Sequence, residues 1–147
     1  MRSKIIYMVI ITPFIVAIGA YLATPINITV VPNWRVIVLD EAGNPLSGVS
    51  VEQRWQYYAL ESSPHLEKKI TDKVGMVNFP KRILVARRSS IVNGYISNFL
   101  TFSVHGSTGK SSNLHVFLDK CRFGEAHYST EKKLPEVIQI KRFPWCK

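Results

Sequence analysis

The sequence has few of the residues on which most catalytic and metal sites depend. Among its 147 residues there are two cysteines and ten acidic residues, and the acidic residues are scattered, so spacing singles out no carboxylate pair for acid–base catalysis. Neither a Gly-rich phosphate loop nor a Gly-x-Ser-x-Gly elbow occurs. The histidines show neither helical i, i+4 spacing nor clustering with cysteine; they are His65, His105, His115 and His127. We therefore expect no enzymatic activity, no cofactor and no metal.

Charge is also missing from one long stretch near the N-terminus. Arg2 and Lys4 are followed by 19 uncharged residues, which begin with Ile5 and end with Ala23. As a helix this stretch would nearly span a hydrocarbon core of about 30 Å, and Tyr21 suits the membrane interface. Three interpretations remain open: an uncleaved anchor, a signal peptide cleaved after small residues near position 19, and a buried helix, which Pro13 and the all-round apolarity disfavour.

Cys121 and Cys146 lie in the part of the chain that would be exported. An even pair of cysteines in a small exported domain usually forms a disulfide. We expect a bridge that closes a loop of about 26 residues and pins the C-terminal tail, worth roughly 3.5 kcal/mol in the chain-entropy model.

The sequence after residue 33 is a series of short β-rich runs separated by turn residues, which is typical of a sandwich or barrel. Residues 34–39 are nearly all apolar and predict a central strand. In residues 49–55 Val49, Val51, Gln53 and Trp55 alternate with polar residues, so that one face meets the core. Further strands are expected in residues 98–104 and 113–118, a hairpin in 69–80 with its tip at 72–75, and either a helical turn or an edge strand in 81–88.

Two segments of these runs resemble the carboxypeptidase regulatory-like domain. Residues 36–51 read VIVLDEAGNPLSGVSV, and residues 71–80 read TDKVGMVNFP. The resemblance covers about a third of the chain. It implies an all-β, immunoglobulin-like (prealbumin-like) sandwich and says little about function. The turn residues support the motif on physical grounds, because Gly75 stands where a tight turn needs positive φ and Asp72 can cap that turn.

The enzymatic alternative is a small hydrolase on a transthyretin-like sandwich. Such a hydrolase ends in Tyr-Arg-Gly-Ser, and this chain ends in Phe-Pro-Trp-Cys-Lys. The two would share only the fold class. A convergent cluster of His, Asp and Arg in one cleft would favour the hydrolase.

Positive charge is concentrated in the second half of the chain. Residues 24–79 carry five Lys/Arg and six Asp/Glu, net −1, whereas residues 80–147 carry twelve against four, net +8. The densest group consists of Lys81, Arg82, Arg87 and Arg88. Either these residues form a binding face for anionic lipid, envelope polymer or an acidic protein, or they are a solvated surface. Nucleic acid is not expected as a partner, because no aromatic stacking motif accompanies the charge.

These observations predict four segments: a transmembrane anchor or signal peptide (1–24), a linker (25–33), the sandwich (34–120) and a C-terminal extension pinned by the disulfide (121–147). The basic start keeps the N-terminus inside, so the domain is expected to be extracytoplasmic, or secreted if residues 1–19 are cleaved. The expected function is a membrane-tethered, non-catalytic interaction or structural module. Its partner is an unidentified protein or an anionic envelope component.

Overall fold

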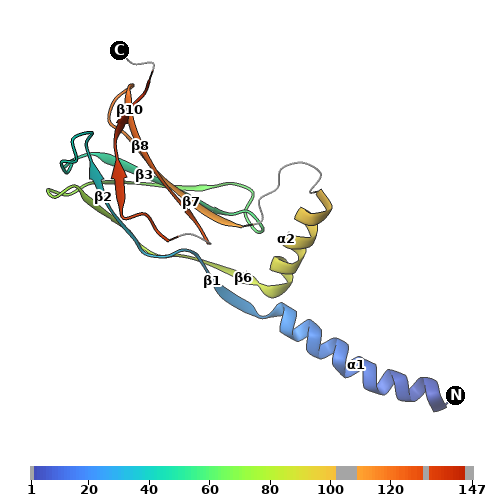
Figure 1. Ribbon diagram of the computed structural model, residues 1–147. Coiled ribbons are helices and arrows are strands. Elements are labelled where there is room, and N and C mark those ends of the chain that lie inside the picture. The colour runs from blue at the N-terminus through green and yellow to red at the C-terminus, as the bar shows by residue number, and fades with distance from the viewer. Residues whose placement is uncertain (1, 102–108, 131–132, 145–147) are drawn as a thin grey trace. The chain divides into compact units, whose positions relative to one another are not determined.

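The computed structural model describes residues 2–101, 109–130 and 133–144, and the side chains of residues 2–10 and 101 are outside that description. The described chain is mostly β, with two helices (Figure 1). It divides into two compact units, residues 1–28 with 84–106 and residues 29–83 with 107–147. Each unit is described below by itself.

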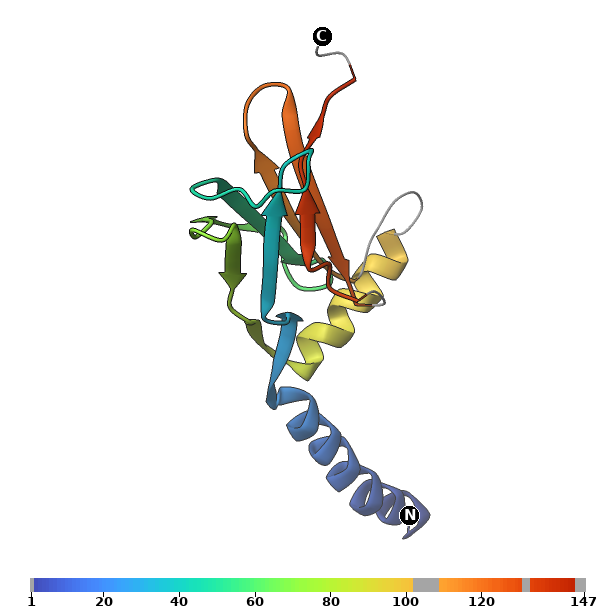
Figure 2. The same ribbon diagram turned by 60° about the vertical axis from the view of Figure 1, so that its left-hand side comes forward.

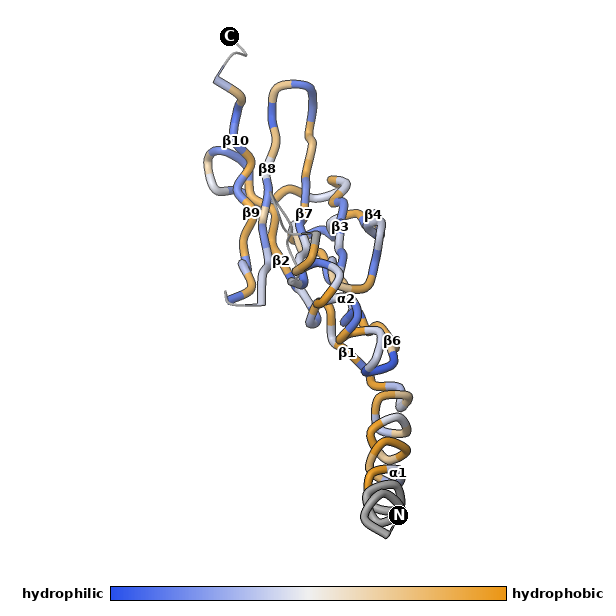
Figure 3. The backbone as a smooth tube through the Cα atoms, turned by 90° about the vertical axis from the view of Figure 1, so that its right-hand side faces the viewer, coloured by the Kyte–Doolittle hydropathy of each residue, from blue (hydrophilic) through white to orange (hydrophobic). Residues whose placement is uncertain are grey.

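The first unit holds both helices, α1 (Arg2–Ala23) and α2 (Arg88–Thr101). The described part of α1 is mostly hydrophobic (Figure 3), and Pro13 lies inside it. Within the described residues, no helix combines the length and the apolar composition that crossing a bilayer needs.

Strands β1 (Pro25–Val31) and β6 (Arg82–Arg87) pair as a two-stranded sheet, and the boundary between the units passes through both. Residues 25–31 are therefore not the linker that the sequence predicted. Ile28, Val30 and Val31 are buried, which gives this segment an apolar contact surface and explains why it is a strand. Of the two options for residues 81–88, the strand is correct.

The second unit contains a five-stranded and a three-stranded sheet. In the larger sheet the strands lie in the order β10 (Lys141–Arg142), β8 (Arg122–Ser129), β7 (Lys110–Phe117), β3 (Ser50–Tyr57), β4 (His65–Ile70). In the smaller sheet the order is β5 (Met76–Phe79), β2 (Trp34–Leu39), β9 (Val137–Gln139). Figure 2 shows β2 and β9 side by side, and they pair in parallel. As predicted, β2 is central in its sheet.

A sandwich-like core lies between these two sheets. On β2 the buried side chains alternate, and Trp34 and Val36 stand opposite Phe79 and Val77 of β5. On β3 Val51 pairs with Val116 of β7 in the same way. The sheets approach closely at Gly124 of β8, where an added Cβ would lie 2.6 Å from Ile138 Cγ2 of β9. A side chain at this position would push the sheets apart.

Three local predictions were wrong. Residues 98–101 belong to α2 and not to a strand, and residues 102–104 lie outside the described residues. The expected hairpin of residues 69–80 has the predicted turn, but β4 and β5 enter different sheets. The C-terminal segment is not an extension of the sandwich, because β8, β9 and β10 are strands of its two sheets. Ala126, Ile138 and Ile140 are buried there.

Candidate functional site

The four basic residues of the predicted binding face fall in both units. Lys81 and Arg82 belong to the second unit, and Arg87 and Arg88 to the first. Lys81 and Arg87 are exposed, whereas Arg82 and Arg88 are half-buried. The exposed members of the predicted face are thus Lys81 and Arg87.

Arg82 has structural partners inside the second unit. Its Nε and one terminal nitrogen donate hydrogen bonds of 3.1 and 3.0 Å to Gln53 Oε1, and the guanidinium forms an ion pair with Glu67. It also lies over the ring of Trp55, 4.3 Å from the ring centroid. Burial lowers the pKa of the Arg82 guanidinium. These contacts satisfy the side-chain oxygen of Gln53, which is fully buried as the alternation of residues 49–55 predicted, whereas Gln53 Nε2 has no hydrogen-bond partner within the described residues.

Arg88 has structural partners inside the first unit. Its guanidinium lies 4.3 Å from the centroid of the Tyr21 ring and donates a hydrogen bond to Thr24 Oγ1. Its backbone N–H donates to Thr24 O at 3.3 Å. Arg88 therefore joins the start of α2 to the end of α1.

The described histidines do not converge on one site. His65 Nε2 lies 2.7 Å from Glu61 Oε1, and the His65 ring stacks on Trp55. His115 stacks on Phe117, and His127 Nδ1 bonds to Asn113 Oδ1. In the part of the chain that the structure describes, no three His, Cys, Asp or Glu side chains could hold a metal ion. His105 lies outside the described residues.

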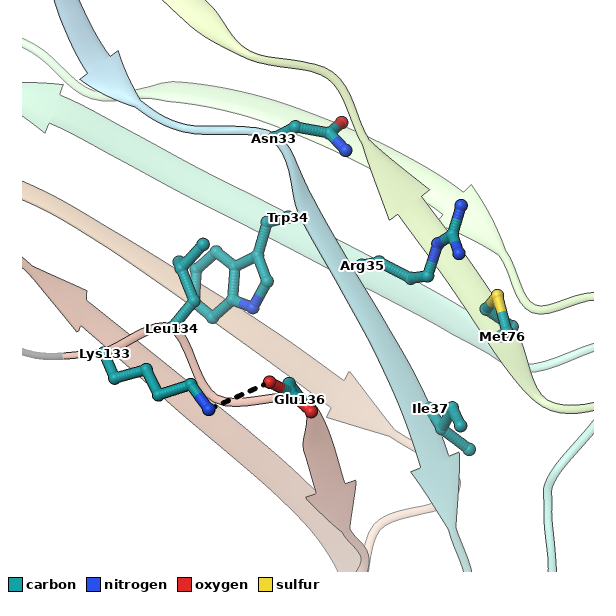
Figure 4. Close-up of a pocket in the computed structure, with 8 residues that line it drawn as sticks. All are labelled: Asn33, Trp34, Arg35, Ile37, Met76, Lys133, Leu134 and Glu136. Atoms are coloured by element: carbon teal, nitrogen blue, oxygen red, sulfur yellow. Dashed lines mark ion pairs between the residues drawn. The ribbon is translucent and has the colours of Figure 1, made fainter.

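A hollow of about 540 Å³ lies beside β2 (Figure 4). Arg35 and Ile37 line it from β2 and Met76 from β5, and the opposite wall is the segment before β9, with Lys133, Leu134 and Glu136. The Trp34 indole fixes this segment by donating a 2.7 Å hydrogen bond to Pro135 O. Lys133 and Glu136 form an exposed ion pair of 3.3 Å.

The hollow beside β2 could bind an apolar group against Ile37 and Met76 and an anionic group at Arg35. The sequence analysis did not identify it. The alternation in residues 34–39 already places Arg35 and Ile37 on the face opposite Trp34 and Val36, so one wall could have been predicted. The other wall could not, because it comes from about 100 residues further along the chain.

A second hollow, of about 390 Å³, lies at one end of β7 and β8. Tyr58, Ser111, His127 and Ser129 are among the residues that line it. Serine and histidine are the residue types of a nucleophilic site. However, His127 bonds to Asn113 and, within the described residues, to no serine. A polar ligand could bind here through hydroxyl and imidazole groups.

Several acidic side chains cap turns of the sandwich. Asp72 Oδ1 accepts hydrogen bonds from the backbone N–H groups of Val74 and Met76, at 3.0 and 2.8 Å, as the sequence predicted. Hydrogen bonds from Asn44 lower the pKa of Asp40. The backbone N–H of Cys121 and the side chain of Arg122 lower the pKa of Asp119. The lowered pKa values favour the ionised, hydrogen-bond-accepting form of the Asp40 and Asp119 carboxylates.

Cys146 lies outside the described residues, so its expected pairing with Cys121 stays a prediction. Cys121 is half-buried. Its carbonyl oxygen accepts a 2.7 Å hydrogen bond from the backbone N–H of Phe143, three residues before Cys146.

No protein-family model matches the chain, and no match was found among curated proteins.

Proposed function

We propose that the chain is a membrane-tethered, extracytoplasmic, non-catalytic interaction or structural module, in which residues 5–23 are the tether. One observation carries this proposal: six large apolar side chains described in α1 are exposed. They are Ile11, Phe14, Ile15, Val16, Ile18 and Tyr21, with exposed fractions from 49% to 67%. A helix that is apolar on all sides needs an apolar surrounding, and a bilayer provides one.

The turn geometry supports a sandwich of the carboxypeptidase regulatory-like, immunoglobulin-like type. Gly43, Gly48 and Gly75, the glycines of the two resembling segments, all have positive φ, at 88°, 73° and 74°. Leu39 and Pro45 form a β-bridge around the first turn. The residues that carry the resemblance thus have conformational roles, which agrees with a motif that specifies a fold.

The positions of the charged groups support a non-catalytic role. Glu61 accepts a 2.6 Å hydrogen bond from the backbone N–H of Tyr57, and Asp40, Asp72 and Asp119 cap turns. Glu67 pairs with Arg82 beside the core. These groups stabilise the sandwich itself. A partner would instead meet the hollow beside β2, where Arg35 is exposed.

The test fuses the full chain at Lys147 to reporters that are active only inside or only outside the cell. Because Arg2 and Lys4 precede the apolar run, the positive-inside rule predicts that only the outside reporter is active. Extraction of membranes with alkaline carbonate should leave the protein in the pellet, and its intact mass should include residues 1–19.

Activity of the inside reporter alone would contradict the extracytoplasmic location. Release by carbonate together with loss of residues 1–19 would show a secreted protein and exclude the tether.

A further inference from the structure

Five large apolar side chains form one face of α2. Val92, Tyr95, Ile96, Phe99 and Leu100 have the spacing i, i+3, i+4, i+7 and i+8, which places them on a single broad stripe. Their exposed fractions are 46%, 46%, 51%, 79% and 75%. In a soluble domain such a stripe normally packs against a core.

The side of α2 that is partly covered is not the apolar stripe. Ile91, Gly94 and Asn98, at i, i+3 and i+7, are half-buried. Within the described residues α2 therefore packs along a side with only one large apolar residue and leaves its apolar stripe exposed. The stripe is suited to a surrounding that the described chain does not supply.

The remaining face of α2 is polar but carries no charge. Ser90 and Ser97 lie opposite the stripe, Asn93 borders it beside Leu100 (i, i+7), and no residue after Arg88 in the helix is acidic or basic. A membrane-surface helix that binds anionic headgroups usually has lysines and arginines on its polar face. The composition of α2 instead fits amphipathic helices that bind lipid by inserting apolar side chains.

The start of α2 is fixed at the end of α1. The Arg88 guanidinium lies over Tyr21 and bonds to Thr24 Oγ1, and the Arg88 backbone N–H bonds to Thr24 O. Tyrosine and arginine are favourable at the boundary between lipid and water, because each has an apolar body and a polar end. If residues 5–23 are a tether, α2 begins where the tether leaves the bilayer.

We propose that α2 lies in the plane of the same membrane, with its apolar stripe inserted between loosely packed, uncharged lipids. This inference rests on the proposed tether. The attachment of Arg88, the first residue of α2, to the end of the proposed tether favours lipid over a protein partner. The lack of charge on α2 after Arg88 predicts that insertion does not require anionic lipid.

The test uses the full chain reconstituted in phosphatidylcholine vesicles, with a photoreactive p-benzoyl-phenylalanine at one position at a time. Position 99 replaces Phe99 on the stripe, position 97 replaces Ser97 on the polar face, and position 14 replaces Phe14 on α1. After illumination, mass spectrometry measures the fraction of protein that carries a lipid adduct. We expect adducts at positions 14 and 99, at least fivefold fewer at 97, and a higher yield at 99 in small, curved vesicles than in large ones.

Position 14 on α1 is the control that separates the proposed tether from the proposed insertion of α2. Lipid adducts at 14 but not at 99, or equal yields at 99 and 97, would overturn the inference and leave the tether intact. An absence of adducts at 14 would overturn the tether. Crosslinking of position 99 to a second copy of the chain, or a yield at 99 that appears only with phosphatidylglycerol and disappears in high salt, would also overturn insertion into neutral lipid.

Discussion

Gly75 stands in the turn between β4 and β5 and has a φ of +74°. A Cβ at this position would lie 2.9 Å from Pro45 Cβ and 3.0 Å from both Leu46 N and Val38 O. The positive φ and the close backbone atoms both exclude a side chain. Gly43 has a similar φ of +88°, but a Cβ there would meet nothing within 4 Å. A side chain at position 43 would therefore meet backbone strain alone, whereas one at position 75 would meet both strain and steric contacts.

We predict that Gly75→Val lowers the free energy of unfolding by about 1 to 3 kcal/mol, and that Gly43→Val lowers it by less. Denaturant unfolding of the two variants and the wild type measures both differences. An unchanged midpoint for Gly75→Val would mean that this turn is not formed as described.

Arg82 is an arginine, a residue type usually found at the surface, but here it has a structural role. We predict that Arg82→Met destabilises the protein by about 1 to 3 kcal/mol, because the buried carbonyl of Gln53 and the carboxylate of Glu67 lose their partner. Lys81→Met is the matched control, since Lys81 is exposed and such substitutions usually change stability by less than about 0.5 kcal/mol. Equal unfolding midpoints for the two variants would contradict the structural role of Arg82.

Among the elements, the C-terminal strands show how the tail is held. β10 pairs with β8, with Lys141 opposite Phe123 and Arg142 opposite Arg122. The hydrogen bond from Phe143 N to Cys121 O continues this pairing, and the rings of Phe123 and Phe143 stack with centroids 4.2 Å apart. The chain therefore returns to Cys121 three residues before Cys146, a distance that the backbone can cover.

We predict that Cys121 and Cys146 form a disulfide in the native protein. Alkylation of the denatured protein should add no label before reduction and two labels after it, as measured by intact mass. Two labels on the unreduced protein would refute the bridge. Because the strand pairing also holds the tail, Cys146→Ser should destabilise the protein without releasing β10 from β8.

At the scale of the whole molecule, the net charge of +9 is unevenly distributed. We predict that full-length protein held in neutral nanodiscs binds phosphatidylglycerol vesicles at low salt. Arg87→Glu together with Arg88→Glu should weaken this binding at least tenfold, because each charge near an anionic surface contributes about 1 kcal/mol. Arg87→Glu alone is the control for the contacts of Arg88 with Tyr21 and Thr24.

Co-sedimentation at low and high salt measures the binding. The difference between wild type and the double variant should disappear at high salt. Equal binding at low salt would identify the basic residues as a solvated surface, and loss of binding only in the double variant would assign the effect to Arg88.

The sequence by itself determined the features that depend on neighbouring residues. The alternation of residues 49–55 predicted the buried side of β3, and glycine and aspartate at fixed offsets predicted the turn at residues 72–75. The near-continuous apolar run of residues 34–39 predicted that β2 is central. In each case the responsible residues lie within a few positions of one another, where side-chain period and turn chemistry act directly.

The tertiary structure decided the features that depend on distant residues. Residues 98–101 join α2 although their short apolar run is also typical of a strand, because periodicity over so few residues does not separate the two. Arg82 turns towards Gln53 and Glu67, which lie 29 and 15 positions earlier. A count of the charged residues along the sequence therefore could not reveal that the Arg82 side chain is half-buried. The segment after residue 121 becomes part of both sheets because β2 and β7 offer unpaired strand edges, and only the folded chain brings those edges to it.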